Sequence, residues 1–193
     1  MEKVAAGLYG LDLAMLVVFQ LMHRDMGLIR HAISAYGRGP SARLFKTYLI
    51  SGSIAALLLA WQFHMAQAPA YPAMIPLYLS LVALGRVLIG LYPNDPRGEP
   101  RTRAGHIHHF ATLLAFTCAF MAVVEATPLL MARASGVWPG VLGTLKHLIS
   151  AGFFAVAVTI SPPLRRFFGL SERLYLYAVA LWCLTASLSL PPL

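Results

Sequence analysis

The sequence predicts an all-α, polytopic membrane protein: one bundle of six transmembrane helices, with both termini on the extracytoplasmic side. Two observations predict this class. Of the 193 residues, 59% are hydrophobic and only 11% are charged, whereas a soluble domain usually carries about 25% charged residues. The apolar residues also fall into six runs, each close to the ~20 residues that a helix needs to cross about 30 Å of hydrocarbon.

The expected spans, in chain order, cover residues 4–22, 47–66, 71–92, 106–127, 141–160 and 174–190 of a single domain. The first run contains Asp12 and is followed by no small-residue cleavage pattern, so we expect a span rather than a secretory signal. The short polar gap 67–70 predicts a tight helical hairpin. Pro93 ends the third span, Pro128 begins an irregular stretch, and Pro162 breaks the fifth span.

The connectors between the spans differ sharply in charge. The first, third and fifth carry Arg24, Arg30, Arg38, Arg43, Lys46, Arg97, Arg101, Arg103, Arg165, Arg166 and Arg173. The opposite side has only Lys3 and Arg133. By the positive-inside rule, the cation-rich connectors lie in the cytoplasm, as in a multi-pass protein of a bacterial inner membrane. The net charge of +8 therefore indicates anionic membrane lipids as partners, not nucleic acid; no protein partner is indicated.

The cytoplasmic ends of the spans gather polar residues, namely His23, His31, Ser34, Asn94, Asp95, His106, His108 and His109. Their connectors are adjacent if neighbouring helices pack together. Imidazoles beside a carboxylate could bind a divalent metal or a phosphate headgroup, or relay protons, or they could be solvated interface anchors. His106 and His109 share a helix face while His108 points elsewhere, so the three cannot bind one ion on an intact helix.

Arg86 lies about two turns from the inner end of the third span. It could snorkel toward headgroups, or it could neutralise a ligand phosphate or the Asp95 carboxylate. The candidate ligand-binding residues are thus Ser34, Arg86, Asp95, His106 and His108. No catalytic residue is assigned, and a zinc site would draw on Asp95, His106 and His108.

A second polar set lies in the outer half of the predicted bundle: Asp12, Glu125, Lys146 and His147. Ionisable groups inside a membrane are costly and are usually paired or functional. One interpretation is an ion pair of Lys146 with Asp12 or Glu125, and the other is a path for protons or ions. His64 and His147 lie at similar expected depth, so a bis-histidine haem is a further alternative.

Three short motifs occur in order along the chain: His31-Ala-Ile-Ser-Ala-Tyr-Gly37, Leu91-Tyr-Pro-Asn-Asp95 and Gly105-His-Ile-His108. Together they resemble a family of six-span prokaryotic membrane proteins, domain of unknown function 998. In that family an Ile-Ser element follows the first helix, a Phe-Pro-x-Asp element ends the third, and a histidine opens the fourth. The resemblance implies the six-helix topology and points to Ser34, Pro93, Asp95 and His108, with Tyr92 in place of the usual Phe. It implies no activity.

The polar residues support three functional hypotheses. The leading one is a non-enzymatic protein whose cytoplasmic polar site, with Arg86, binds an anionic lipid headgroup or another small ligand and needs no cofactor. Each cation near an anionic surface contributes about 1 kcal/mol. The second is a zinc-dependent lipid hydrolase in which Ser34 orients water or substrate. The third is a small proton-coupled carrier that uses the intramembrane set around Asp12.

Overall fold

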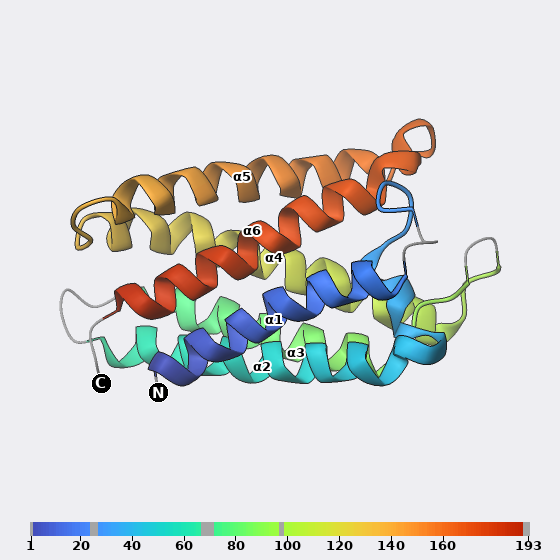
Figure 1. Ribbon diagram of the computed structural model, residues 1–193, viewed down its shortest axis with the longest axis horizontal. Coiled ribbons are helices and arrows are strands. Elements are labelled where there is room, and N and C mark those ends of the chain that lie inside the picture. The colour runs from blue at the N-terminus through green and yellow to red at the C-terminus, as the bar shows by residue number, and fades with distance from the viewer. Residues whose placement is uncertain (1, 24–26, 67–71, 97–98, 191–193) are drawn as a thin grey trace.

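A computed structural model describes residues 2–23, 27–66, 72–96 and 99–190, and this part of the chain is helical with no strand. Its long helices are α1 (Glu2–Met22), α2 (Ala42–Met65), α3 (Met74–Leu91), α4 (Arg103–Met131), α5 (Trp138–Thr159) and α6 (Phe168–Ser189). Short 3₁₀ helices lie in the connectors: η1 (Ile33–Gly37), η2 (Gly39–Ser41) and η3 (Pro162–Phe167). The predicted all-α fold with six long helices is confirmed (Figure 1).

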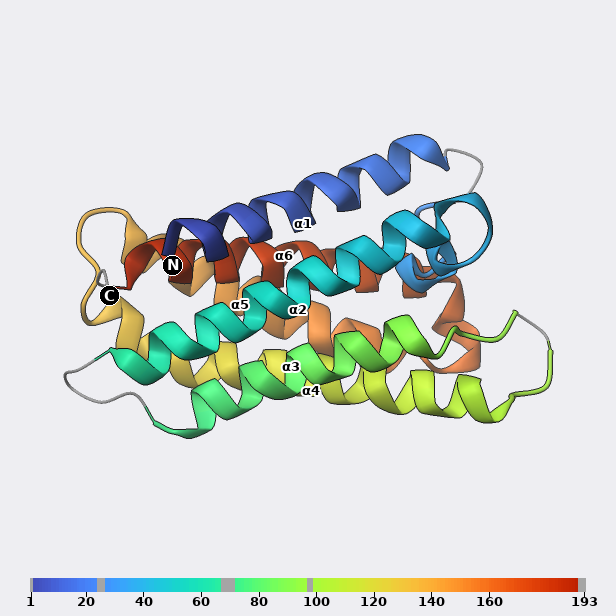
Figure 2. The same cartoon turned by 90° about the horizontal axis from the view of Figure 1, so that it is seen from below.

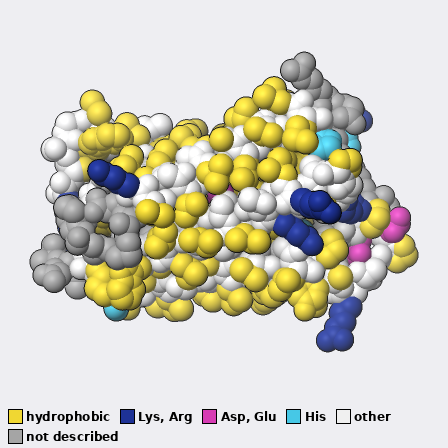
Figure 3. All heavy atoms as spheres, turned by 60° about the horizontal axis from the view of Figure 1, so that its bottom comes forward, with side chains coloured by type: hydrophobic (Ala, Val, Ile, Leu, Met, Phe, Trp, Pro, Cys, Tyr) yellow, Lys and Arg dark blue, Asp and Glu magenta, His cyan; other side chains and the backbone are white. Residues whose placement is uncertain are grey.

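All six helices are long and apolar enough to cross a membrane. Their outward faces carry large hydrophobic side chains such as Ile50, Leu113 and Phe154, which are 59%, 63% and 60% exposed. Figure 3 shows hydrophobic side chains along the length of one face, with Lys and Arg side chains toward its two ends. So much exposed apolar surface fits a lipid solvent, as expected of a multi-pass membrane protein.

The helices form a closed ring in sequence order. Each helix packs on the next along the chain, and α6 packs on α1 to close the ring (Figure 2). Both termini lie at one end of the bundle (Figure 1). The opposite end, here called the rim, consists of residues 27–41, 92–96, 99–102 and 160–167. The three connectors that the sequence groups by positive charge therefore share one end.

Small residues allow the helices of the ring to approach closely. A Cβ atom added at Gly85 of α3 would lie 2.8 Å from the Cβ of Ala115 of α4. One added at Gly152 of α5 would lie 3.0 Å from the Cα of Tyr175 of α6. Close packing of this kind is a main source of helix association in lipid, where the hydrophobic effect does not drive helices together.

Helix α6 begins earlier than the hydropathy of the chain suggests. It starts at Phe168, whereas the expected span starts at residue 174. Arg173 was expected among the exposed connector cations, but it is helical and only 5% exposed. Hydropathy fails here because Glu172 and Arg173 are polar residues that the first connector covers, so their burial leaves no apolar signal.

Helix α4 continues through Pro128 to Met131, where the sequence suggested an irregular stretch. Thr127 donates its hydroxyl to the Val123 carbonyl, at 2.6 Å. Proline is tolerated in membrane helices because neighbouring helices and polar side chains can satisfy the backbone groups that it frees. The hairpin expected at 67–70, and the connector cations Arg24 and Arg97, lie outside the described residues.

Candidate functional site

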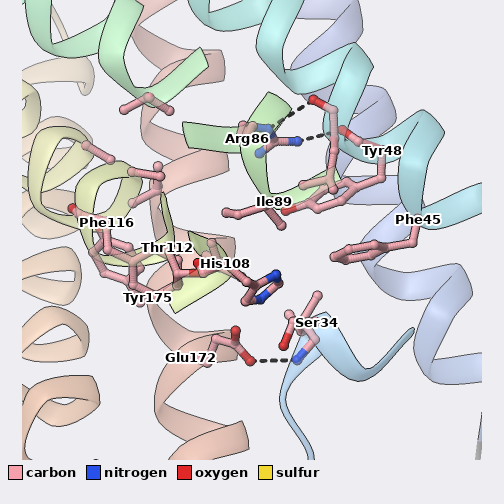
Figure 4. A pocket seen from close by; sticks show the side chains of 17 residues that line it. Ser34, Phe45, Tyr48, Arg86, Ile89, His108, Thr112, Phe116, Glu172 and Tyr175 are labelled. Atoms are coloured by element: carbon pink, nitrogen blue, oxygen red, sulfur yellow. Dashed lines mark hydrogen bonds between the residues drawn. The ribbon is translucent and has the colours of Figure 1, made fainter. Parts of the chain in front are cut away.

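An internal cavity lies inside the ring and extends inward from the rim (Figure 4). Its volume is about 80 Å³, several times the space that one water molecule requires. Along α4 its lining runs from His108 to Ala119, a distance of about 16 Å at 1.5 Å per residue. Most of the wall is apolar; the polar lining residues are Ser34, Tyr48, Arg86, His108, Thr112, Glu172 and Tyr175.

His108 projects into this cavity from the second turn of α4 (Figure 4). Its Nδ1 lies 2.8 Å from the Tyr92 carbonyl oxygen, and its side chain is buried. Because a carbonyl oxygen only accepts, Nδ1 carries the hydrogen, and Nε2 of the neutral ring is an acceptor. His106 and His109 are exposed on the other side of the helix, the separation that helical spacing predicts.

Glu172 faces the cavity from the beginning of α6 and is 4% exposed. One carboxylate oxygen accepts a hydrogen bond from the Ile33 backbone N–H, at 2.6 Å. Figure 4 shows the second oxygen directed into the cavity, on the side of His108. Among the described residues that line the cavity, Arg86 has an ion-pair partner in Asp12, whereas Glu172 has none and is attracted electrostatically by Arg173.

Arg86 forms part of the cavity wall on α3, and its guanidinium is already engaged (Figure 4). Nη2 lies 2.8 Å from Oδ2 of Asp12 and donates to the Tyr48 carbonyl at 2.6 Å. Nε donates to the Leu49 carbonyl at 3.4 Å. Gly52 is required beside this pair, because a Cβ there would overlap both the guanidinium and the carboxylate.

The hydroxyl groups of the cavity differ in what they can still donate. Thr112 donates to the His108 carbonyl at 2.8 Å, and Tyr175 donates to the Phe116 carbonyl at 2.5 Å. Each of these two hydroxyls can therefore only accept a bond from a molecule in the cavity. Ser34 accepts a long bond, 3.5 Å, from Asn94 Nδ2, and its own hydrogen stays available.

The loop between α3 and α4 holds His108 in place from outside the cavity. Asp95 accepts from the Thr102 hydroxyl at 2.8 Å and from the Thr102 backbone N–H at 2.9 Å. Thr102 in turn caps α4 by accepting from the Gly105 N–H at 3.1 Å. The pKa of the Asp95 carboxyl is lowered, chiefly because the Thr102 hydroxyl and N–H stabilise the carboxylate. Asp95 therefore acts as a positioning residue at the helix start.

The connector between α1 and α2 is fastened over the cavity by Arg173 of α6. Its Nη1 donates to the carbonyls of Leu28 at 2.9 Å and His31 at 2.6 Å. Its Nη2 donates to the Tyr36 hydroxyl at 3.0 Å. Together with the bond from Ile33 to Glu172, these contacts fix η1 so that Ser34 borders the cavity.

Three of the five residues proposed from sequence meet at the cavity: Ser34, Arg86 and His108. Asp95 and His106 do not line it. Sequence reasoning missed Glu172, which the hydropathy boundary placed in a connector. A carboxylate directly before an apolar run is the signal that could have drawn attention to it, because intramembrane acids are rare and usually functional.

The intramembrane set of Asp12, Glu125, Lys146 and His147 does not form the ion pair proposed between Asp12 and Lys146. Asp12 is 1% exposed and pairs with Arg86. Arg86 of α3 reaches Asp12 across α2, because Gly52 has no side chain to fill the space that the two groups occupy. Glu125 lies near Tyr78 of α3.

Zinc and haem ligands were also proposed from sequence. No group of three or more His, Cys, Asp or Glu side chains that could hold a metal occurs among the described residues. For haem, His64 of α2 and His147 of α5 are both exposed, and these helices are not neighbours in the ring. The zinc-dependent hydrolase therefore stays a prediction, which elemental analysis of the purified protein would test.

The chain was compared with known proteins. The family model described as "Protein of unknown function (DUF998)" matches residues 5–189. No curated protein and no solved structure matches the chain. All residues that line the cavity fall inside the matched range. Because a fold does not by itself imply a function, the chemistry of the cavity has to carry the functional argument.

Proposed function

The chain belongs to the DUF998 family, whose description assigns no activity, and we propose from the cavity that the protein binds a small amphiphile of the membrane. The supporting observation is an apolar cavity with convergent polar groups at its rim end: Ser34, His108 and Glu172. Ligand sites are typically mostly apolar pockets with a few well-placed polar groups. The polar end of the ligand would lie at these residues, and its hydrocarbon part would extend along α4.

The apolar lining supports a hydrocarbon chain deeper in the cavity. Beyond the polar end, the wall is formed by Val82, Ala115, Phe116, Ala119 and Val179. A chain that enters from the bilayer stays in apolar surroundings there and gains van der Waals contacts with this wall. A purely polar solute would gain nothing from this half of the cavity, so an amphiphile fits the whole of it.

We also propose that the rim faces the cytoplasm of a bacterial cell, with both termini outside. Exposed arginines at this end, such as Arg101, Arg165 and Arg166, support the proposal, since cytoplasmic loops carry an excess of Lys and Arg. The same side chains would attract anionic headgroups of the surrounding bilayer. These surface contacts are separate from the internal cavity.

A cavity-filling substitution tests the proposed function. Thr112 borders the cavity and is half-buried, whereas Leu113, the next residue, is 63% exposed on the outer surface. Both would be replaced by Phe, and the proteins would be purified from membranes in mild detergent. Small molecules retained by each protein would be extracted and quantified by mass spectrometry.

We expect the wild-type protein and Leu113→Phe to retain the same amphiphile in a near-stoichiometric amount. Thr112→Phe should lose most of it, because the aromatic side chain of the new Phe would fill part of the cavity beside α4. Equal retention by both variants would contradict binding in this cavity. An equal unfolding temperature for the two variants would show that a loss is not due to misfolding.

A further inference from the structure

The cavity also indicates which headgroup its ligand carries. Resting on the proposed function, we infer that the ligand bears a protonated amine, which the free oxygen of Glu172 and Nε2 of His108 bind at the rim end of the cavity. The inference depends on the charges that face the cavity, on its unused hydrogen-bond acceptors, and on the burial of Glu172.

The charges that face the cavity favour a cationic group. Arg86 and Glu172 are the charged residues in its lining. The charge of Arg86 is balanced by Asp12 at 2.8 Å. Arg173 follows Glu172 in sequence, but it lies outside the lining and donates to the carbonyls and the hydroxyl that hold the first connector. Glu172 is thus the charged residue of the described lining without an ion-pair partner, although Arg173 attracts its carboxylate from outside the lining.

The hydrogen-bonding groups near Glu172 also favour a cationic group. His108 Nε2 can only accept, because Nδ1 carries the hydrogen that bonds to Tyr92. The hydroxyls of Thr112 and Tyr175 have already donated their hydrogens to backbone carbonyls. An ammonium group brings three donors and no acceptor, so it matches this end of the cavity. A phosphate or carboxylate brings only acceptors and a second negative charge.

The burial of the Glu172 carboxylate is the third reason to expect a cationic ligand group. Glu172 is 4% exposed, and the hydrogen bond from the Ile33 N–H uses one of its two oxygens. A buried charge without an opposite partner is strongly unfavourable in a low-dielectric interior. A ligand ammonium would supply a hydrogen-bonded cation for the second oxygen of Glu172, and the apolar lining would accept the attached carbon chain.

Four probes separate the headgroup classes: n-dodecylamine, 1-dodecanol, dodecyl phosphate and n-butylamine. The first three share one chain, so their differences report the headgroup, while n-butylamine tests whether a free small amine suffices. Tritiated n-dodecylamine would be bound to the full-length protein in dodecyl maltoside micelles, and the other probes would compete with it. The variant is Glu172→Gln, which keeps an oxygen to accept from Ile33. Glu125→Gln, on α4 outside the cavity lining, is the matched control.

In the wild-type protein we expect the amine to bind more tightly than the alcohol, and the phosphate to be the weakest competitor. Glu172→Gln should weaken amine binding by at least about tenfold, the effect of losing a charged hydrogen bond. It should leave dodecanol within about twofold of wild type, and Glu125→Gln should change neither. Effective competition by n-butylamine would support the amine and identify its source as a free small molecule.

Two results would overturn the inference while leaving the proposed function intact: amine binding unchanged in Glu172→Gln, or dodecyl phosphate as the strongest competitor. Failure of every probe to bind, together with equal ligand retention by Thr112→Phe and Leu113→Phe, would instead overturn the proposed function. The order of the probes in the wild-type protein decides the question even if Glu172→Gln does not fold.

Discussion

Replacing Arg86 by leucine should leave the carboxylate of Asp12 buried without its cation. Asp12 is 1% exposed and would retain only the Ser51 hydroxyl, at 2.9 Å, as a hydrogen-bond donor. Removing one partner of a buried ion pair typically costs about 3–5 kcal/mol. We therefore expect Arg86→Leu to lower the free energy of unfolding by about this amount.

Replacing both partners by leucine should behave differently from the single change. Apolar pairs of similar volume in place of a buried ion pair are often neutral or stabilising by about 1–4 kcal/mol. The double variant Asp12→Leu/Arg86→Leu should thus recover most of the lost stability. The resulting coupling energy in a double-mutant cycle would be about 3 kcal/mol or more, the upper part of the range for residues in contact.

Reversible unfolding in mixed micelles of dodecyl maltoside and increasing dodecyl sulfate, followed by circular dichroism, would measure these differences. Gly52→Ala offers a second route to the same pair, because its Cβ would displace the guanidinium. Gly10→Ala on α1 is the control, since nothing lies within 4 Å of a Cβ at that position. Equal loss of stability in the single and double leucine variants would refute the reasoning.

Further predictions concern the rim. Asp95→Asn should lower the unfolding temperature at neutral pH, and the difference from wild type should begin to shrink at about pH 4, the usual pKa of an unfolded Asp. Because the pKa of Asp95 is lowered in the folded state, the difference should vanish only when the pH falls below that folded-state pKa. Arg173→Met should destabilise the protein by about 3 kcal/mol and raise hydrogen exchange in residues 27–37, and unchanged exchange would contradict its role as the fastening residue. In a variant without its two native cysteines, single cysteines would be placed at Arg101 and Ser135, both exposed. In intact spheroplasts, a membrane-impermeant thiol reagent should label the cysteine at 135 and not the one at 101. Labelling at Arg101 from outside would reverse the proposed orientation.

The six helices, and the packing of each on the next along the chain, follow from features that a sequence displays directly. Each long apolar run is a span because lipid offers no partner for an exposed backbone, and short connectors force neighbouring spans together. His108 could be separated from His106 and His109 by helical spacing alone. These inferences are local, or depend only on chain connectivity.

The partners of ionisable residues were harder to predict from the sequence. The sequence left headgroups, a ligand phosphate or Asp95 as alternatives for Arg86, but its side chain pairs with Asp12 deeper in the bundle. From the rim ends of their helices, Arg86 is about 8 Å and Asp12 about 15 Å deep at 1.5 Å per residue. An arginine side chain is long enough to span this difference in depth. Whether it extends toward the rim or deeper into the bundle depends on the groups that the neighbouring helices offer. Hydropathy contains no information on that choice.

The residues of the three sequence motifs mostly position the cavity rather than face it. Asp95 and Thr102 start α4, and the carbonyl of Tyr92 orients His108. Gly105 permits this arrangement, because a Cβ there would overlap the Asp95 carboxylate. Glu172 belongs to none of these motifs, yet it fastens η1 and offers its second oxygen to the cavity. A motif can therefore fix the geometry of a site while the group that selects the ligand lies elsewhere in the chain, which is why substitution of Glu172 tests ligand chemistry more directly than substitution of Asp95.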